Sequence, residues 1–515
     1  MNGAESLIHT ALAAGVELCL ANPGTTEMPL VMALDRVPGM RAVLGLFEGV
    51  CTGAADGYGR MAGKPALTLL HLGPGFANGI ANLHNARRAR SPVVNLVGDH
   101  ATWHRAADAP LTSDIASLAK PVSHWVRTAK SSHTVAEDVA VAVAAAARAS
   151  GQVASLILPT DCLWGESPGP AHPKRPVKAK AVAVTVVEGA AARLRANRPA
   201  ALFLGGLALR QQGLRAAARV AKAVGCRVIS ECFPARLERG RGIPQVERLP
   251  YFPEKARQAL AGLSTLVLAG APEPVTFFGY PDTPSYSAPP DCERFFLAQP
   301  QEDAAAALEA LAEALDATGA DMRDAPVPQR PGGGLTLQSV GAVLAAVQPE
   351  GAIIVDESNA TGLGYFPVSA GSPPHSFLAL TGGAIGQGPP CATGAALACP
   401  DRPVINFQAD GSAMYTLQAL WTQAREGLHV ITLICANRGY QVLQLEMARA
   451  GAAELGRHAR TLTELKNPML DFVQLSKGMG VPAARVDSAE ALMRELERAL
   501  AEPGPHLIEM AMQSQ

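Results

Sequence analysis

The sequence has 515 residues, and its 44 Lys and Arg against 45 Asp and Glu give a formal net charge of −1. This balance excludes the broad basic surface typical of nucleic-acid binding, and 48% hydrophobic residues predict several buried cores. No apolar stretch approaches the ~20 residues that span a bilayer. The opening MNGAESL has no basic signal-peptide segment, so we expect a cytoplasmic protein without membrane association. Nine scattered cysteines without a C-x-x-C pair predict buried thiols rather than disulfides or a zinc site.

Two proline-rich stretches, 164–180 and 317–334, predict linkers, because proline removes a backbone donor and clustered glycine adds freedom. They divide the chain into three segments, 1–165, 181–317 and 335–515. In each segment short apolar runs alternate with Ala-rich helical stretches, as buried parallel strands with crossover helices do. The fold class we predict is α/β, with three doubly wound parallel-sheet domains. The predicted strands are 17–20, 42–47, 66–72, 93–97 and 155–158, then 200–204, 227–229 and 265–268, and finally 352–355, 404–407, 430–435 and 507–510.

Glycines after the third predicted strand suggest a dinucleotide-binding turn. Gly73, Gly75 and Gly79 open a helical stretch, and Asp99 follows the last of them by 20 residues. Their spacing is G-x-G-x-x-x-G rather than the fingerprint G-x-G-x-x-G, and Pro74 would stiffen the turn. A nicotinamide-dependent oxidoreductase is therefore a weak alternative.

A sharper pattern lies in the third segment. Asp410, Gly411 and Ser412 follow a predicted strand and precede a helix predicted at 414–425. Asn437 ends the next strand 27 residues after Asp410, which is about one βαβ unit. The carboxyl ends of neighbouring parallel strands meet at one sheet edge, where ligands bind. A carboxylate, an amide oxygen and a backbone carbonyl beside a diphosphate form the oxygen set that Mg²⁺ prefers. Spacing alone leaves a turn Asp and a capping Asn as an equal alternative.

This pattern resembles the motif of the thiamine diphosphate (ThDP) enzyme family, which begins Gly-Asp-Gly and ends in Asn. The chain differs at Ala409, where the family usually has Gly. The family also has a catalytic Glu ahead of a helix reading Gly-Tyr-Ala-Arg, and Glu48 followed by the stretch 55–60 (ADGYGR) is similar. Further similarities cover nearly the whole length and point to the branch of benzoylformate decarboxylase and acetolactate synthase. These further matches are 22–25 (NPGT), His71, Gly73-Pro74-Gly75 with Asn78, and 383–386 (GAIG).

The resemblance implies a three-domain order, with a pyrimidine-binding domain, a central domain and a diphosphate-binding domain. Glu48 would activate ThDP through its aminopyrimidine to give a thiazolium ylid, which adds to the substrate carbonyl and leads to an enamine after CO₂ is lost. His71 would relay protons, and Thr25 and Asn78 would contact substrate. On residue type alone, Glu48 also suits a helix N-terminus, and His71 suits a hydrogen-bonded core position.

The cofactor positions follow from the same resemblance. Gly383 would offer its carbonyl to the 4′-amino group, and Ile385 would support the bent cofactor, although core packing alone also accounts for an isoleucine. The metal ligands implied are Asp410, Asn437 and the carbonyl of Gly439. The diphosphate-side candidates are Asn359, Asp410, Gly411, Ser412, Asn437 and Tyr440.

The function we predict is a ThDP- and Mg²⁺-dependent 2-oxo acid decarboxylase, with an acetolactate synthase-like carboligase as the alternative. A ThDP-fold protein that only binds is disfavoured because Glu48 is present. The central segment has no FAD signature, so we expect no FAD. The partners implied are a small 2-oxo acid, an aldehyde acceptor in the carboligase case, and a second copy in a homodimer or homotetramer with active sites between subunits.

Departures from benzoylformate decarboxylase concern the substrate. That enzyme has a second active-site His in its central domain, where this chain reads 275–280 (VTFFGY). Val442 and Leu443 resemble apolar positions beside the substrate, and Glu446 stands where an aromatic residue is expected. We therefore expect poor turnover of benzoylformate and carboligation with a small neutral aldehyde.

Overall fold

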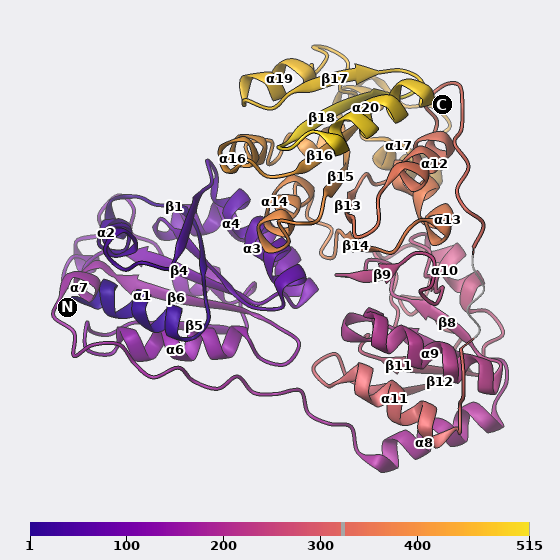
Figure 1. The fold of residues 1–515 in the computed structure, drawn as a ribbon, viewed down its shortest axis with the longest axis horizontal. Helices are drawn as coiled ribbons and strands as arrows, with labels where there is room; N and C mark the ends of the chain where they lie inside the picture. The colour runs from indigo at the N-terminus through magenta and orange to yellow at the C-terminus, as the bar shows by residue number, and fades with distance from the viewer. Residues whose placement is uncertain (321–324, 514–515) are drawn as a thin grey trace. The chain divides into compact units, whose positions relative to one another are not determined.

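The computed structural model describes residues 1–320 and 325–513, and the chain forms two compact units. The larger unit comprises Met1–Pro176, Val327–Pro373 and Leu380–Gln515, and the smaller unit comprises Val177–Pro326 and Pro374–Ala379. Figure 1 shows the elements coloured in chain order. Of the predicted second linker, residues 321–324 lie outside the described residues.

The N-terminal part of the larger unit is a six-stranded parallel sheet in the order β2-β1-β3-β4-β6-β5. Its strands are β1 (Leu18–Asn22), β2 (Arg41–Leu44), β3 (Ala66–Leu70), β4 (Val93–Asp99), β5 (Trp125–Thr128) and β6 (Val153–Pro159). Its helices are α1 (Gly3–Ala13), α2 (Met28–Arg36), α3 (Glu48–Ala62), α4 (Leu72–Ala89), α5 (Ile115–Ala119), α6 (Val135–Ala146) and α7 (Thr160–Trp164), with 3-10 turns η1 (Thr25–Glu27) and η2 (Arg105–Ala107).

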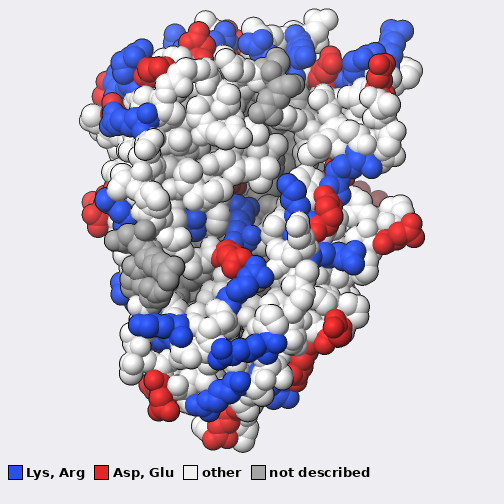
Figure 2. All heavy atoms as spheres, turned by 90° about the vertical axis from the view of Figure 1, so that its right-hand side faces the viewer, with Lys and Arg blue, Asp and Glu red and all other residues white. Residues whose placement is uncertain are grey.

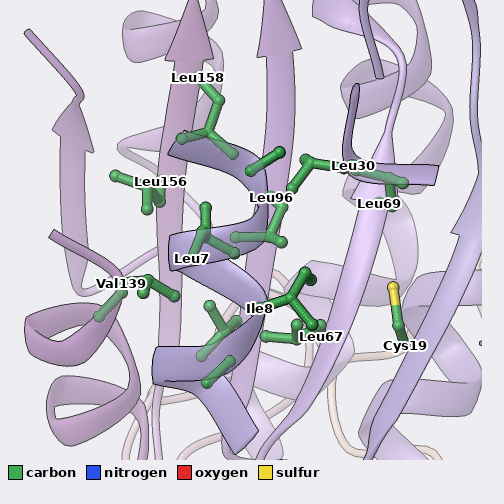
Figure 3. Close-up of a cluster of buried hydrophobic side chains, with 14 of the residues drawn as sticks. Leu7, Ile8, Cys19, Leu30, Leu67, Leu69, Leu96, Val139, Leu156 and Leu158 are labelled. Atoms are coloured by element: carbon green, nitrogen blue, oxygen red, sulfur yellow. The ribbon is translucent and has the colours of Figure 1, made fainter. Parts of the chain in front are cut away.

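Alternate residues of these strands face two apolar cores on opposite sides of the sheet. On one side, Leu7 and Ile8 of α1 pack against Leu67 and Leu69 of β3 and Leu96 of β4 (Figure 3). Each fully buried side chain of this size contributes roughly 1.5–3 kcal/mol to folding. The core on the other side includes residues of α3 and α4, so helices cover both faces.

The C-terminal part of the larger unit is built on the parallel strands β17-β18-β16-β15-β13. These are β13 (Ile353–Glu357), β15 (Val404–Ala409), β16 (Val430–Ala436), β17 (Ala483–Val486) and β18 (His506–Ala511). The helices are α12 (Leu337–Val347), α13 (Tyr365–Val368), α14 (Gly388–Ala398), α15 (Asp410–Ala413), α16 (Ala419–Glu426), α17 (Gln441–Arg449), α18 (Arg457–Thr463), α19 (Phe472–Gly478) and α20 (Ala489–Ala501), with η4 (Thr361–Gly364) and η5 (Ser369–Gly371).

Helix α14 packs closely on helix α3 of the N-terminal part (Figure 1). Glycines make this approach possible, because a Cβ atom on Gly57 would collide with the Cys391 carbonyl and one on Gly394 would collide with the Ala54 carbonyl. The helix that begins with Glu48 is therefore held directly against the C-terminal part of the same unit.

The smaller unit contains a five-stranded parallel sheet in the order β10-β8-β7-β11-β12. Its strands are β7 (Ala200–Leu204), β8 (Arg227–Ser230), β10 (Glu247–Arg248), β11 (Thr265–Ala269) and β12 (Glu293–Ala298), and an antiparallel pair joins β9 (Leu237–Arg239) to β14 (His375–Ala379). Its helices are α8 (Val184–Ala196), α9 (Gln211–Val224), α10 (Pro253–Leu260) and α11 (Ala304–Ala314), with η3 (Gly206–Leu209). The three parallel sheets confirm the predicted α/β fold class.

Side chains of both charges are scattered over the face shown in Figure 2, which also has a broad uncharged area. Among the described residues, no helix has both the length and the apolar character needed to cross a bilayer.

Candidate active site

The Asp410 pattern lies where two neighbouring parallel strands end. Strands β15 and β16 pair in register, with Ala409 beside Cys435. Asp410 follows β15 directly and Asn437 follows β16 directly. The fold therefore brings both residues to the carboxyl edge of one sheet, where doubly wound proteins bind ligands.

The carboxyl group of Asp410 is buried, with an exposed fraction of 2%, and two backbone amides hold it. Its Oδ1 accepts a hydrogen bond from Gly411 N at 2.8 Å, and its Oδ2 accepts one from Arg438 N at 2.6 Å. Burial raises the pKa of Asp410 to about 6, although both amides act in the opposite direction. A cation beside this carboxylate would offset the cost of keeping its charge away from water.

Asn437 and Gly439 supply the other oxygen atoms predicted for a metal. Asn437 Oδ1 accepts from Gly439 N at 3.1 Å, and Asn437 Nδ2 donates to Gln441 Oε1 at 3.3 Å. In the described part of the chain, no three His, Cys, Asp or Glu side chains form a group that could hold a metal. A metal here would rely on amide and carbonyl oxygens beside one carboxylate, a hard donor set that suits Mg²⁺ with diphosphate and water oxygens.

The four remaining diphosphate-side candidates lie at the same edge. A Cβ atom on Gly411 would lie 2.5 Å from Cε1 of Tyr440, so the aromatic ring covers this glycine and leaves no room for a side chain. Asn359 follows β13 and donates its Nδ2 hydrogen to Ser412 Oγ at 3.1 Å. Ser412 belongs to the short helix α15, whose four residues are all buried and whose N-cap, Ala409, provides no side-chain cap.

Ala409 occupies the position at which the family motif has Gly. It is the N-cap of α15, with φ −78° and ψ 145°. This is extended backbone that any residue adopts, so alanine introduces no strain here.

The helix predicted at 414–425 is wrong in its first half. Helix α15 ends at Ala413 and α16 begins at Ala419, with a turn between them. Tyr415 N donates to Ser412 O at 3.2 Å, and Thr416 Oγ1 donates to Gly386 O at 2.8 Å. The backbone between the two helices pairs three residues back, as in a turn, and the Thr416 hydroxyl holds this turn against a loop.

That loop, residues 382–388, connects to α14 and contains Gly383 and Ile385; it is called the α14 loop below. Gly383 and Gly386 have φ of +76° and +94°, a region that favours glycine. Asn82 and Asn85 of α4 donate to backbone carbonyls of the loop at 3.3 and 2.8 Å. No residue of the described chain donates a hydrogen bond to the Gly383 carbonyl, which leaves this acceptor for a ligand.

Glu48 is the first residue of α3 and is buried, with 9% of its surface exposed. Its Oε2 accepts a hydrogen bond from Asn78 Nδ2 at 3.0 Å. A Cβ atom on Gly75 would lie 2.9 Å from Glu48 Oε1 and 3.3 Å from His71 Cβ. The structure therefore brings Glu48, His71 and Asn78 together around Gly75.

His71 has a partner that the sequence analysis missed. Its Nδ1 lies 2.7 Å from Glu27 Oε2, and Glu27 is fully buried. Glu27 also accepts from Gly24 N at 2.7 Å and from Thr26 Oγ1 at 2.5 Å. The imidazole packs against Gly24, where a side chain would collide with the ring. The turn after β1 thus fixes the ring of His71.

Thr25, predicted to contact substrate, is an exposed residue at the start of η1. Its neighbour Thr26 is the threonine that approaches His71, with 3.3 Å between Oγ1 and Nδ1. Both threonines belong to the turn that carries Glu27. The sequence signal that could have identified Glu27 is a lone acidic residue in the turn between a predicted strand and the next helix.

The glycines of the dinucleotide alternative are explained by packing within the chain. A Cβ atom on Gly73 would collide with Ser113 Oγ, one on Gly75 would crowd Glu48, and one on Gly79 would lie 2.7 Å from Thr52 Cγ2. These glycines allow α4 to approach its neighbours, which accounts for them without a phosphate.

Asn82 connects the two halves of the candidate site. Its Nδ2 lies 2.9 Å from Gly49 O and 3.3 Å from Gly386 O. Gly49 follows Glu48, and Gly386 follows Ile385, so one side chain contacts the neighbours of both predicted functional residues.

The positions at which the sequence differs from benzoylformate decarboxylase belong to different units of the chain. Glu446 of α17 pairs with Arg449 at 3.5 Å, and Leu443 of the same helix is exposed. Phe277 and Phe278 belong to the smaller unit, where their rings contact each other with centroids 5.0 Å apart.

Two family models match the chain. The model of the thiamine pyrophosphate enzyme N-terminal TPP binding domain matches residues 1–118. The model of the thiamine pyrophosphate enzyme C-terminal TPP binding domain matches residues 362–510. The first match contains Glu48 and His71, and the second contains Asp410 and Asn437.

Proteins that match the chain over its whole length include other thiamine diphosphate enzymes or proteins named after them. The chain is 52% identical, over 100% of its length and 99% of the relative, to the Mycobacterium tuberculosis protein named "Putative acetolactate synthase large subunit IlvX". It is 30% identical to benzoylformate decarboxylase of Pseudomonas aeruginosa over 97% of both chains. Its fold matches the solved Rhodococcus jostii thiamine diphosphate-dependent 4-hydroxybenzoylformate decarboxylase with a TM-score of 0.88, at 24% identity and 100% coverage of both chains.

Proposed function

Since this chain belongs to the thiamine pyrophosphate enzyme family, we propose that it is a ThDP- and Mg²⁺-dependent decarboxylase of a 2-oxo acid. The observation that carries the choice of decarboxylation is the Glu27–His71 pair beside Glu48. A buried carboxylate that fixes an imidazole next to the cofactor-activating acid provides a proton donor for the product carbon.

The residues at the sheet edge suit the cofactor. Asp410 is a buried carboxyl whose charge calls for a cation, and Asn437 and Gly439 add the neutral oxygen donors. We propose that these three hold Mg²⁺ on the diphosphate. Asn359, Gly411, Ser412 and Tyr440 would line the diphosphate itself, and the Gly383 carbonyl and Ile385 would contact the aminopyrimidine and thiazolium.

When bound, ThDP supplies a thiazolium carbon that adds to a 2-oxo acid and accepts the electrons released with CO₂. Glu48 would exchange a proton with the aminopyrimidine ring nitrogen. Asn78 orients that carboxyl through the 3.0 Å hydrogen bond to Oε2. Glu27 accepts from His71 Nδ1, which leaves Nε2 to hold or deliver a proton at the substrate.

A carboligase is the second candidate, and the 52% identity to a protein named as an acetolactate synthase large subunit favours it. The stretch 275–280 has no His, so His71 would be the main proton donor. If His71 alone delivered the proton to the product carbon, protonation would be slow, and an aldehyde acceptor would compete with it. Decarboxylation and carboligation share every earlier residue and differ only in this last step.

For the substrate we propose a small aliphatic 2-oxo acid, with poor turnover of benzoylformate. Glu446 on α17 would place a carboxylate, paired with Arg449, near an apolar aryl group. Product analysis with pyruvate, benzoylformate and small aldehydes tests both points. Release of aldehyde without acyloin supports the decarboxylase, and acyloin as the main product supports the carboligase. Benzoylformate cleaved at least as efficiently as every aliphatic acid would contradict the substrate class.

A further inference from the structure

We infer that Glu357 is a positioning residue that fixes the α14 loop and thereby places the Gly383 carbonyl and Ile385. The inference rests on the proposed role of these two loop residues in the ThDP site. Glu357 itself has no part in the proposed chemistry.

Glu357 is the last residue of β13 and lies beneath the α14 loop. Its Oε1 accepts a hydrogen bond from Gly386 N, and its Oε2 accepts one from Gly388 N, both at 2.6 Å. Gln408 of the neighbouring strand β15 donates its Nε2 hydrogen to Oε2 at 3.1 Å. Both carboxylate oxygens therefore bind the backbone of a loop that has no strand or helix pairing of its own.

The fit between loop and strand is close. A Cβ atom on Gly388 would collide with Gln408 Oε1 and lie 2.8 Å from Asn406 Oδ1 and 3.0 Å from Glu357 Oε2. Three polar side chains from β13 and β15 thus form a floor on which only a glycine backbone can rest.

A buried carboxyl group costs folding free energy when it is ionised, because it is removed from water. Glu357 is 2% exposed, and burial raises its pKa to about 7. The ionisable groups near it include Cys391 of α14, whose pKa burial raises to about 12, and Arg60 of α3, which approaches the loop residue Gln387. Arg60 is itself paired with Asp56 of the same helix at 2.6 Å. An apolar residue would avoid the desolvation cost but would leave two buried amides without acceptors.

The opposite side of the loop is held by α4. Asn85 exchanges hydrogen bonds with Ala384, accepting from its amide at 3.2 Å and donating to its carbonyl at 2.8 Å. His84 Nε2 lies 3.1 Å from Gly382 O. Residues 382, 384 and 386 are thus anchored, whereas among the described residues no hydrogen bond engages the backbone of Gly383 or Ile385.

This alternation explains what Glu357 does. Anchors on every second residue present the two intervening residues in one fixed arrangement, as a preorganised binding site requires. If the Glu357 acceptors are lost, the backbone amide of Gly386 loses its hydrogen bond. Gly383 and Gly386, which have positive φ, are then free to change conformation. The Gly383 carbonyl and Ile385 would then move with them.

The test compares Glu357→Gln with Glu509→Gln. Glutamine keeps the shape but turns one acceptor into a donor that faces a backbone amide. Glu509 is a matched control, because it is also a buried carboxyl at a strand of this sheet, is 1% exposed and pairs with Arg485 at 2.9 Å. Glu357→Asp keeps the charge one methylene further back and serves as the second variant.

Amide hydrogen exchange of the peptide containing the α14 loop is measured first, on protein without cofactor. We expect exchange to rise about tenfold in Glu357→Gln, less in Glu357→Asp, and not in Glu509→Gln. Calorimetry with ThDP and Mg²⁺ should then show about tenfold weaker affinity in Glu357→Gln alone. Should Glu357→Gln not fold, Glu357→Asp against Glu509→Gln decides the question.

Loop exchange and ThDP affinity equal to wild type in folded Glu357→Gln would overturn the inference. If Glu357→Gln does not fold, equal amide exchange of the α14 loop in Glu357→Asp and Glu509→Gln would also overturn the inference. Failure of the proposed function looks different, because wild-type protein would then not bind ThDP while the exchange difference would persist.

Discussion

Glu27 and His71 lie 2.7 Å apart, Oε2 to Nδ1, although 44 residues separate them in the sequence. The carboxylate is buried beneath the turn after β1, and a side chain on Gly98 of β4 would displace it. An ionised carboxylate can only accept, so the Nδ1 hydrogen points to Glu27 and Nε2 faces away. The turn therefore sets both the tautomer and the orientation of the imidazole.

Glu27→Ala should lower kcat about tenfold while ThDP affinity stays unchanged, because His71 loses the group that orients it. Steady-state kinetics and calorimetry measure the two quantities. Glu17→Gln is the matched control, since Glu17 is an exposed carboxylate that pairs with Lys64 at 2.7 Å. A kcat within twofold of wild type would show that His71 works without its partner.

Glu48→Gln should bind ThDP yet slow proton exchange at its thiazolium carbon by about a hundredfold or more, because the amide cannot exchange a proton with the aminopyrimidine. Quenched deuterium exchange followed by NMR gives the rate. Asn78→Ala should have a smaller effect of the same kind, since it removes only the 3.0 Å hydrogen bond to Glu48. Exchange as fast as wild type in Glu48→Gln would make this residue a helix-terminal acid only.

Asp410→Ala should abolish the Mg²⁺-dependent part of ThDP binding, because the only carboxylate of the proposed donor set is removed. Titration calorimetry with and without a chelator separates that part. The control is Asp401→Ala, at an exposed position before β15. Unchanged affinity in Asp410→Ala would reject the metal assignment.

If active sites form between subunits, two inactive variants should complement each other. Mixing Glu48→Gln with Asp410→Ala after dissociation and reassociation would produce some sites in which both residues are wild type, and activity should return to roughly a quarter of wild type for random pairing into dimers. Light scattering of the wild type checks that an oligomer exists. No recovery from an oligomer that exchanges subunits would mean that each chain completes its own site.

Glu357 should make stability depend on pH. Its pKa is raised to about 7 in the folded protein, against 4.5 as the ordinary value, so the folded state binds more protons between these pH values. Stability therefore falls as pH rises from about 5 to 8, by up to about 3 kcal/mol from this residue.

Urea unfolding of cofactor-free protein at about pH 5 and about pH 8 gives the difference in the free energy of unfolding. Glu357→Gln should reduce the fall, whereas Glu509→Gln should leave it as in wild type. Asp410 contributes a fall of the same sign in all three proteins, because burial raises its pKa to about 6. A fall of the same size in Glu357→Gln would show that the carboxyl titrates normally.

The sequence predicts most of the fully buried strands, with β14 (His375–Ala379) as an exception, and it predicts partly covered strands poorly. Strand β7 has the predicted limits, because its five residues are all apolar and buried. Strands β5 and β17 were missed, since polar and apolar residues mix where only part of a strand is covered. The helix after Asp410 was placed wrongly because the bond from Thr416 to Gly386 depends on a loop that is distant in the sequence.

The candidate site also has residues that the sequence predicts and residues that only the structure reveals. The 27-residue spacing places Asp410 and Asn437 on adjacent strands because parallel strands recur at regular intervals. Glu27 and Glu357 have no such regularity, and only the folded chain shows what their carboxylates contact. The residues expected to bind the cofactor follow the family motif, whereas Glu27, which contacts His71, and Glu357, which contacts the neighbour of Ile385, do not.

Ala409 has a practical consequence for how such proteins are recognised. Its extended backbone accepts any small side chain, whereas Gly411 two positions later lies under the ring of Tyr440 and tolerates none. The two glycines of the usual signature are thus unequal: one is replaceable and the other is not. A search pattern that insists on both would pass over sequences like this one, and a pattern that keeps only the second would retrieve them.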